Sequence, residues 1–289
     1  MASTEALDVI AIDSDHCEAV WPLSVEAGWN QNLADWRFML GAGQGFGCTG
    51  ADGKWQASAL VLPLGQKLAW ISMVLVTKER RRSGLGTGLL KRCIDEVRSA
   101  GAVAGLDATE QGRPIYLPLG FHDLYRISRW HFERVKDAAV LPPAGIKLRP
   151  VGPADLPKLA LYDRPLTGME RPAILAHLAL RQPGRAWIAE DAAGRILGFV
   201  LGREGRMATS LGPVVADGEA IALALIAQAA ASAPGPFIID VPEAHRAVCA
   251  WLEAQGATTP RGYMRMTLGE AKGLDDPTHL FALAGPELG

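Results

Sequence analysis

Cysteine is scarce in this chain, and its four copies stand far apart: Cys17, Cys48, Cys93 and Cys249. None of them forms a Cys-x-x-Cys pair, which is the spacing typical of many zinc and redox sites. The sequence therefore argues against a structural zinc ion and against a disulfide framework. The six histidines show no metal-ligand spacing either. No metal is expected.

A strong net charge and long apolar runs are also missing. The formal net charge is −2 and the isoelectric point is near 6.3, so the chain lacks the basic footprint of a nucleic-acid-binding protein. No uninterrupted apolar run reaches the roughly 18 residues that a membrane-spanning helix needs. Met1 to Asp15 lacks the apolar core of a signal peptide. We therefore expect a cytoplasmic protein without nucleic acid or membrane partners, and its oligomeric state is left open.

Glycine and arginine are concentrated in one stretch, Arg81 to Gly88. The preceding residues, Trp70 to Val76, are apolar and rich in β-branched side chains, which predicts a buried strand. The following apolar residues recur at three- and four-residue spacing, which predicts a helix: Leu85, Leu89, Leu90, Cys93, Ile94 and Val97. A glycine-rich helix start exposes N–H groups and the positive end of the helix dipole, and both attract phosphate. With Arg81 and Arg82 beside it, we interpret the stretch as a pyrophosphate cradle.

Two better-known phosphate-binding patterns do not fit this stretch. No Gly-Lys-Ser or Gly-Lys-Thr follows the glycines, which excludes a Walker sequence. A dinucleotide fingerprint has two residues between its second and third glycines, whereas only one residue separates Gly86 from Gly88. No acidic residue ends a second strand about 20 residues further on. A glycine-rich helix start after a strand also occurs in α/β proteins that bind nothing there, so spacing alone leaves a purely structural role open.

Two motifs, in this order, resemble signatures of the GNAT superfamily of N-acetyltransferases. Its motif A is an Arg or Gln, two residues, Gly, one residue, then Gly or Ala, after a strand that ends in Val. Arg81, Gly84 and Gly86 take the three fixed positions of that motif. The second signature, Tyr, three residues, then Gly-Phe, is present as Tyr116 to Phe121. The resemblance is strong over residues 5–135 and faint beyond them.

The resemblance implies acetyl-CoA as the acyl donor and assigns the residues that hold it. The backbone of three strand residues would pair with the pantetheine and acetyl groups: Val74, Leu75 and Val76. The pyrophosphate would be held by the cradle: Arg81, Arg82, Ser83, Gly84, Leu85, Gly86 and Thr87. Thr109 stands where many relatives have an Asn that contacts the cofactor, and it keeps a hydroxyl but not the amide.

Tyr116 is the expected general acid, because relatives carry a tyrosine at this place before Gly-Phe. A phenol with a pKa of about 10 can protonate a departing CoA thiolate. The alternative is a tyrosine that only packs on the sheet. The general base is not evident, because the two places where relatives carry a Glu are Trp70 and, on the next strand, a position near Ala104.

Four side chains are left as candidates for the base: Asp35, Asp107, Glu110 and His122. Ordered water, or loss of the proton before the amine binds, would serve equally well. The segment Glu287 to Gly289 is a further candidate, since in some multi-domain acetyltransferases the chain terminus reaches the active site. The pair Asp275-Asp276 is interpreted as part of a solvated loop.

Three tryptophans, Trp21, Trp29 and Trp36, fall in two predicted helices after the first strand, with Asn30 as the expected cap of the second helix. In the family these helices overhang the acceptor. The tryptophans could therefore line an apolar or cation-binding pocket, with Asp35 available to an amine. The alternative is core packing, because Trp29 and Trp36 fit one apolar helical stripe.

The order of predicted elements repeats after a linker at residues 136–146, which contains a proline pair. We therefore expect an α/β fold of two tandem GNAT-like domains, residues 1–135 and 147–289, each a twisted mixed β-sheet flanked by helices. The counterpart of the cradle in the second domain lacks the arginine and carries Asp217 and Glu219, which would repel a pyrophosphate. Only the first domain is expected to bind acetyl-CoA.

Together these patterns predict an acetyl-CoA-dependent N-acetyltransferase that moves an acetyl group to a primary amine of a small molecule or peptide, directly, in a ternary complex. One alternative is a non-catalytic acyl-CoA-binding or regulatory module, which the missing carboxylate base favours slightly. Another is a transferase of a longer acyl group, which the tryptophan-rich first helices could accommodate. The near-neutral charge does not identify the acceptor.

Overall fold

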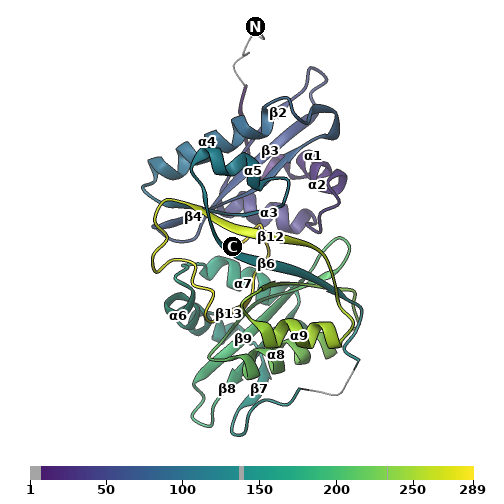
Figure 1. Cartoon of the computed structure of the whole chain (residues 1–289), viewed down its shortest axis with the longest axis vertical. Coiled ribbons are helices and arrows are strands. Elements are labelled where there is room, and N and C mark those ends of the chain that lie inside the picture. Colours follow the sequence, from purple (N-terminus) through teal and green to yellow (C-terminus); the bar gives the residue numbers. More distant parts are fainter. Residues whose placement is uncertain (1–7, 137–139, 233) are drawn as a thin grey trace. The chain divides into compact units, whose positions relative to one another are not determined.

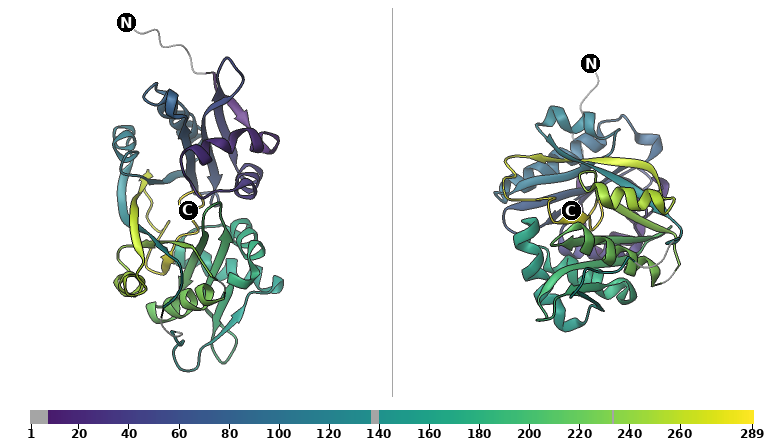
Figure 2. Two further views of the ribbon diagram at one scale, coloured as in Figure 1. Left: turned by 90° about the vertical axis from the view of Figure 1, so that its right-hand side faces the viewer. Right: turned by 60° about the horizontal axis from the view of Figure 1, so that its bottom comes forward.

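The computed structural model of the chain describes residues 8–136, 140–232 and 234–289. The chain folds into two compact units, residues 1–105 and 106–289, and each is described by itself (Figures 1 and 2). The chain passes from one unit to the other inside a strand, β5 (Val103–Ala108). None of the helices in the described ranges is both long and apolar enough to cross a membrane.

The first unit is a mixed sheet with helices on both faces. Its elements are β1 (Ile10–Ile12), η1 (Ser14–His16), α1 (Cys17–Val20), α2 (Pro22–Glu26), α3 (Leu33–Ala42), β2 (Gln44–Thr49), β3 (Trp55–Pro63), β4 (Leu68–Val76), η2 (Lys78–Arg80), α4 (Leu85–Ser99) and the start of β5. The strands lie in the order β1-β2-β3-β4-β5. Neighbours from β1 to β4 are antiparallel, whereas β4 and β5 are parallel and joined by α4. A parallel pair needs such a crossover.

Different helices cover the two faces of this sheet. The Arg92 guanidinium of α4 lies 4.5 Å from the centre of the Phe46 ring, whereas a Cβ on Gly45 would come within 2.5 Å of Leu40 in α3. Successive residues of a strand point to opposite faces, so α3 and α4 pack on opposite sides of β2. The predicted apolar face of α4 is confirmed, because all six residues are buried: Leu85, Leu89, Leu90, Cys93, Ile94 and Val97.

Of the three tryptophans in the first helices, one is fully buried and two are half-buried. Trp36 is 1% exposed and its Nε1 donates to Ser24 Oγ at 2.9 Å, which confirms the core interpretation for this residue. Trp21 and Trp29 are half-buried. The predicted cap at Asn30 is wrong, because α3 begins after Asn32, whose side chain accepts from the first-turn N–H groups.

The second unit is built on a larger mixed sheet. Its elements are the end of β5, α5 (Arg113–Tyr116), η3 (Leu117–Leu119), β6 (His122–Phe132), β7 (Lys147–Pro150), η4 (Pro153–Asp155), α6 (Leu156–Thr167), α7 (Pro172–Arg181), η5 (Pro183–Arg185), β8 (Trp187–Glu190), β9 (Ile196–Glu204), β10 (Thr209–Ala216), α8 (Glu219–Ala231), β11 (Phe237–Pro242), α9 (Arg246–Ala254), β12 (Thr258–Leu268) and β13 (Leu280–Ala282). Its strands run β12-β6-β11-β10-β9-β8-β7, with β13 beside β10.

The second unit repeats the crossover of the first. β10 and β11 are parallel, from Thr209 opposite Phe237 to Leu211 opposite Ile239, and α8 joins them as α4 joins β4 to β5. Eight residues of α8 are buried, because the helix is apolar on all sides and is enclosed by the core. The repeated strand–helix–strand unit confirms the predicted tandem arrangement of mixed sheets.

The compact units do not follow the predicted domain limits. β6 pairs with β12 and with β11 along most of its length, so its contacts place it in the second unit although it precedes the predicted linker. The predicted domain boundaries, 1–135 and 147–289, therefore remain a prediction, which is based on the repeated order of elements in the sequence. Residues 1–7 of the first domain and 137–139 of the linker lie outside the described residues, and β7 begins at Lys147.

Candidate functional site

An irregular strand leads to the cradle. Met73 in β4 has a left-handed φ of 51°, the register of β3 against β4 shifts beside it, and its carbonyl accepts from Ser58 Oγ at 2.9 Å. This is a bulge, which re-aims the strand beyond it. Beyond the bulge, Leu75 and Val76 pair with β3, whereas the ladder to β5 in the first unit stops at Trp70. Within the described part of that unit, the other edge of residues 74–76 is left for a ligand.

The cradle itself is a tight turn into α4. Arg82 and Gly84 both have left-handed φ values, 62° and 86°, and Ser83 Oγ donates to the Arg80 carbonyl at 2.5 Å. Gly84 is the N-cap of α4, and no side chain caps the first turn. The N–H groups at this helix start are therefore left for solvent or an anion.

Two glycines of the cradle, Gly84 and Gly86, are needed for different physical reasons. Gly84 supplies a φ that other residues adopt only with strain. Gly86 lets the helix start approach the strand, because a Cβ there would lie 3.3 Å from Val76 Cγ2. Arg81 and Arg82 are exposed, and no hydrogen bond or ion pair engages either side chain among the residues that the structure describes. The arrangement fits a pyrophosphate: uncapped N–H groups, a helix dipole and two uncommitted guanidinium groups.

Thr109 and Tyr116 lie in the second unit, and the hydroxyl groups of both lie close to Gly112. A Cβ on Gly112 would lie 3.2 Å from the Tyr116 hydroxyl and 3.3 Å from Thr109 Oγ1, so both oxygens approach the same point. The Thr109 carbonyl accepts from the N–H groups of Gly112 at 3.0 Å and Arg113 at 2.9 Å, and Thr109 Oγ1 accepts from Gly112 at 3.1 Å. Thr109 therefore starts the turn that carries Tyr116 on α5.

The Tyr-x-x-x-Gly-Phe signature has a local structural basis. Gly120 ends η3 with a left-handed φ of 94°, and Phe121, which is 2% exposed, packs with its ring 6.0 Å from that of Tyr116. Tyr116 is half-buried. Burial raises the pKa of Tyr116 to about 12, which keeps the phenol protonated at neutral pH.

Two of the predicted base candidates have structural roles. Asp35 Oδ2 accepts from the Asn32 N–H at 3.0 Å and completes the capping box of α3. Asp107 makes a two-pronged ion pair with Arg265, with both contacts at 2.8 Å and both side chains fully buried. The Trp70 position also carries no base: its indole is buried and packs on Gly105, where a Cβ would come within 2.3 Å of the ring.

The other candidates are dispersed. Glu110 is exposed, and His122 is exposed with its Nε2 3.2 Å from Thr267 Oγ1. Glu287 is 2% exposed and forms an ion pair with Arg203 inside the second unit. Within the described ranges, no group of three or more His, Cys, Asp or Glu side chains is placed to hold a metal ion.

The solvated-loop interpretation of Asp275-Asp276 is half wrong. Asp276 is exposed, as expected, but the Asp275 side chain is fully buried and accepts from Arg265 at 2.6 Å and from the Tyr125 hydroxyl at 2.9 Å. Two adjacent aspartates usually mark a loop in water, and no local pattern distinguishes the buried one. The partner that buries Asp275, Arg265, stands ten residues away on β12.

The counterpart of the cradle in the second unit differs in chemistry. Asp217 accepts from the Tyr162 hydroxyl at 2.7 Å, and Glu219 is the first residue of α8. The strand edge before it is also occupied, because β10 pairs with β13 through Val214 and Val215. Residues 74–76 of β4, at the same place before α4, have no such partner within the described part of their own unit.

Comparison with known proteins agrees with these features. A family model described as "Acetyltransferase (GNAT) family" matches residues 12–121, and one described as "Acetyltransferase (GNAT) domain" matches residues 159–282. The Bacillus subtilis (strain 168) protein named "Uncharacterized N-acetyltransferase YitH" is 26% identical over 239 residues, which cover 82% of this chain and 83% of that protein.

Solved structures share the fold. A Pyrococcus horikoshii protein, provisionally named an acetyltransferase, superposes with a TM-score of 0.78 at 20% identity over 100% of this chain and 99% of its own. A tandem GNAT protein from the clavulanic acid biosynthesis pathway has a TM-score of 0.62 at 14% identity, over 91% of this chain and 99% of its own. The two family matches, one in each half of the sequence, and the repeated crossover lead to one conclusion: the chain belongs to the GNAT acetyltransferase superfamily and carries two GNAT-type regions in tandem.

Proposed function

We propose that the protein is an acetyl-CoA-dependent N-acetyltransferase that acts on a primary amine of a small molecule or peptide. The observation that carries the proposal is the bulged strand β4, which leads into an uncapped helix start with two uncommitted arginines. Family membership supports acyl transfer in general, and this local geometry suits the pantetheine and pyrophosphate of a CoA thioester. A cytoplasmic location remains a prediction from composition.

The donor would be held by backbone groups and charge. Residues 74–76 present a strand edge on which the amide groups of pantetheine can form ladder hydrogen bonds. The N–H groups of Leu85, Gly86 and Thr87, with Arg81 and Arg82, would neutralise the pyrophosphate. Holding the donor at a fixed edge also fixes its carbonyl for attack, which is the positional part of catalysis.

The chemical step needs two proton movements. The neutral amine attacks the thioester carbonyl carbon, the C–S bond breaks, and the departing thiolate takes a proton. We assign that proton to the Tyr116 hydroxyl, whose pKa of about 12 keeps it protonated at neutral pH. The proton lost by the amine nitrogen would pass to solvent, because Asp35 and Asp107 are committed to a helix cap and an ion pair.

A non-catalytic acyl-CoA-binding module is the second candidate, and this commitment of the carboxylates favours it. A transferase of a longer acyl group is a third, supported by the half-buried Trp21 and Trp29. Thiol release from acetyl-CoA and from longer acyl-CoA esters, measured with a panel of small amines and peptides, separates the three. Binding without release supports the module, and faster release from the longer esters supports the third candidate.

The first test is binding of the donor. Acetyl-CoA with a Kd of roughly 1 μM, supplied at about 100 μM, should stabilise the fold by about 2.7 kcal/mol and raise the melting temperature. CoA should also raise it, whereas pantetheine, which lacks the pyrophosphate, should do so much less. An unchanged melting temperature with acetyl-CoA would sink the cofactor assignment.

We further propose that only the first GNAT-type region binds acetyl-CoA. In the second region, β13 fills the strand edge beside Val214 and Val215. The backbones are so close there that a Cβ on Gly212 would clash with the Leu283 carbonyl oxygen, 1.9 Å away. Asp217 and Glu219 add negative charge at the start of α8, where a pyrophosphate would be repelled. The second region therefore has neither an open edge nor a suitable helix start.

A further inference from the structure

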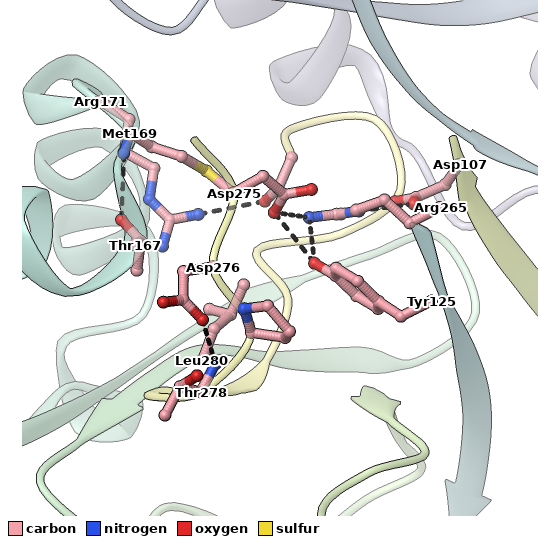
Figure 3. Close-up of polar contacts among 12 residues, drawn as sticks. Asp107, Tyr125, Thr167, Met169, Arg171, Arg265, Asp275, Asp276, Thr278 and Leu280 are labelled. Carbon is pink, nitrogen blue, oxygen red and sulfur yellow. Dashed lines mark hydrogen bonds and ion pairs between the residues drawn. The ribbon is translucent and has the colours of Figure 1, made fainter. Parts of the chain in front are cut away.

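Three polar side chains, Asp107, Tyr125 and Asp275, surround the buried Arg265 in the second unit (Figure 3). The Arg265 guanidinium donates to both oxygens of Asp107 at 2.8 Å, to Asp275 Oδ1 at 2.6 Å and to the Tyr125 hydroxyl at 3.0 Å. Tyr125 in turn donates to Asp275 Oδ1 at 2.9 Å. The side chains of Arg265, Asp107 and Asp275 are 0% exposed. Such charge-assisted pairs hold their partners in one geometry.

The members of this Arg265 cluster come from segments far apart in the sequence. Asp107 and Tyr125 precede the predicted linker, whereas Arg265 and Asp275 follow it, and 158 residues separate Asp107 from Arg265. Arg265 lies on β12 and Asp275 in the loop that follows it. The second GNAT-type region thus supplies the guanidinium that holds an aspartate of the first.

A short path leads from Asp107 to the expected general acid. Asp107 lies on β5, two residues before Thr109. Thr109 accepts three hydrogen bonds from the N–H groups that begin the turn into α5, and the hydroxyl groups of Thr109 and Tyr116 both lie close to Gly112 in that turn. A shift of the end of β5 would therefore move the residue that starts the helix of Tyr116.

The two carboxylates of the cluster are buried deeply enough to raise their pKa values. Burial raises the pKa of Asp107 to about 6, and it raises that of Asp275 as well. The groups that face the two carboxylates come from four further elements: Arg265 on β12, Tyr125 on β6, Asp240 on β11 and Arg171 before α7. Because the negative charge of Asp275 contributes to the raised pKa of Asp107, removing that charge should lower the pKa of Asp107.

We infer that Arg265 is a positioning residue: through Asp107 and Thr109 it holds Tyr116 where the proton is needed, so that turnover in the first GNAT-type region depends on a side chain of the second. This inference rests on the proposed function. It gives a role to a second region that lacks a cradle of its own.

The test compares Arg265→Lys with a matched variant, Arg129→Lys. Arg129 forms a similar two-pronged pair with Asp240, with both contacts at 2.7 Å and with side chains that are 9% and 5% exposed. It lies on β6, and among the described residues no hydrogen bond or ion pair joins its side chain to β5. Lysine keeps the charge and loses the fork geometry in both variants. At a temperature where both are folded, Arg265→Lys should lower kcat at least tenfold with KM for acetyl-CoA within twofold. Arg129→Lys should leave kcat within twofold.

A second variant keeps the inference testable if Arg265→Lys does not fold. Asp275→Asn removes one charge but keeps the oxygen that accepts from Arg265 and Tyr125, and the other oxygen, Oδ2, has no hydrogen-bond partner among the described residues. The ratio of its kcat to that of the wild type cancels the titration of the acceptor amine. That ratio should rise at least threefold between pH 7 and pH 5, because Asp107 stays charged to a lower pH in the variant.

The outcomes separate the inference from the proposed function. Wild-type protein that binds acetyl-CoA but releases no thiol with any amine contradicts the proposed function, and the inference falls with it. Wild-type turnover with equal kcat losses in Arg265→Lys and Arg129→Lys contradicts the inference alone, since both residues would then act only on stability. A kcat ratio for Asp275→Asn that stays flat with pH also contradicts it.

Discussion

At the scale of single residues, Tyr116 has the properties that the acid role requires. Its hydroxyl lies close to Gly112, its ring lies 6.0 Å from that of Phe121, and burial raises its pKa to about 12, so that the phenol carries a proton at neutral pH. Tyr116→Phe should lower kcat about 100-fold, within the usual range for loss of a general acid, and leave KM for acetyl-CoA nearly unchanged. Steady-state thiol release checks this. An unchanged kcat in Tyr116→Phe would contradict the acid role.

Asp107 predicts how stability depends on pH. Because its pKa in the fold, about 6, is raised above the ordinary value of 3.8, its proton stabilises the fold fully below about pH 4. That contribution is lost as the pH rises through 6. The free energy of unfolding of the wild type, measured relative to Asp107→Asn, should therefore fall between pH 4 and pH 7. Urea melts across this range measure it, and a difference that grows with pH would contradict the buried assignment.

At the scale of elements, the two ends of α4 offer a matched pair of glycines. Gly84 and Gly101 have φ values of 86° and 69°, and a Cβ at either would meet nothing within 4 Å. Alanine at either position should therefore cost a similar amount, about 1–2 kcal/mol, for the left-handed backbone alone. Only Gly84 belongs to the cradle, so Gly84→Ala should also raise the Kd for acetyl-CoA about tenfold or more.

Chemical denaturation and calorimetric titration together check the glycine pair. Gly101→Ala is the control for stability, because it strains the same helix at the end away from the cradle. Equal Kd values for the two variants would mean that the backbone geometry at Gly84 does not contribute to donor binding.

At the scale of the whole molecule, two related regions should provide one donor site. The edge of β10 is taken by β13, and the start of α8 is acidic, so titration calorimetry should give one acetyl-CoA bound per chain. Asp217→Asn combined with Glu219→Gln should leave that number at one, because the strand edge stays filled. Two sites per chain would show that β13 yields to the donor.

Local patterns were enough to predict several of the elements and the glycine-rich turn that begins α4. Sequence pattern correctly predicted β4 from its apolar, β-branched run and α4 from its helical period, because burial of one helix face imposes a period of 3.6. Gly84 and Gly120 could be recognised because a left-handed φ restricts the residue type at a single position. The predicted N-cap of α3 was two residues too early. Asn30 and Asn32 are the same residue type, and only the hydrogen bonds of the folded chain show that Asn32 is the cap.

By itself the sequence determined the superfamily, the tandem repeat and the glycine-rich turn into α4, because each depends on residues close together in the chain. Only the tertiary structure decided that Asp107 pairs with Arg265, that Asp275 is buried and that β13 fills the edge of β10. These facts join residues up to 158 positions apart. No spacing rule connects such positions, because the chain between them can close a loop of almost any length at similar entropic cost.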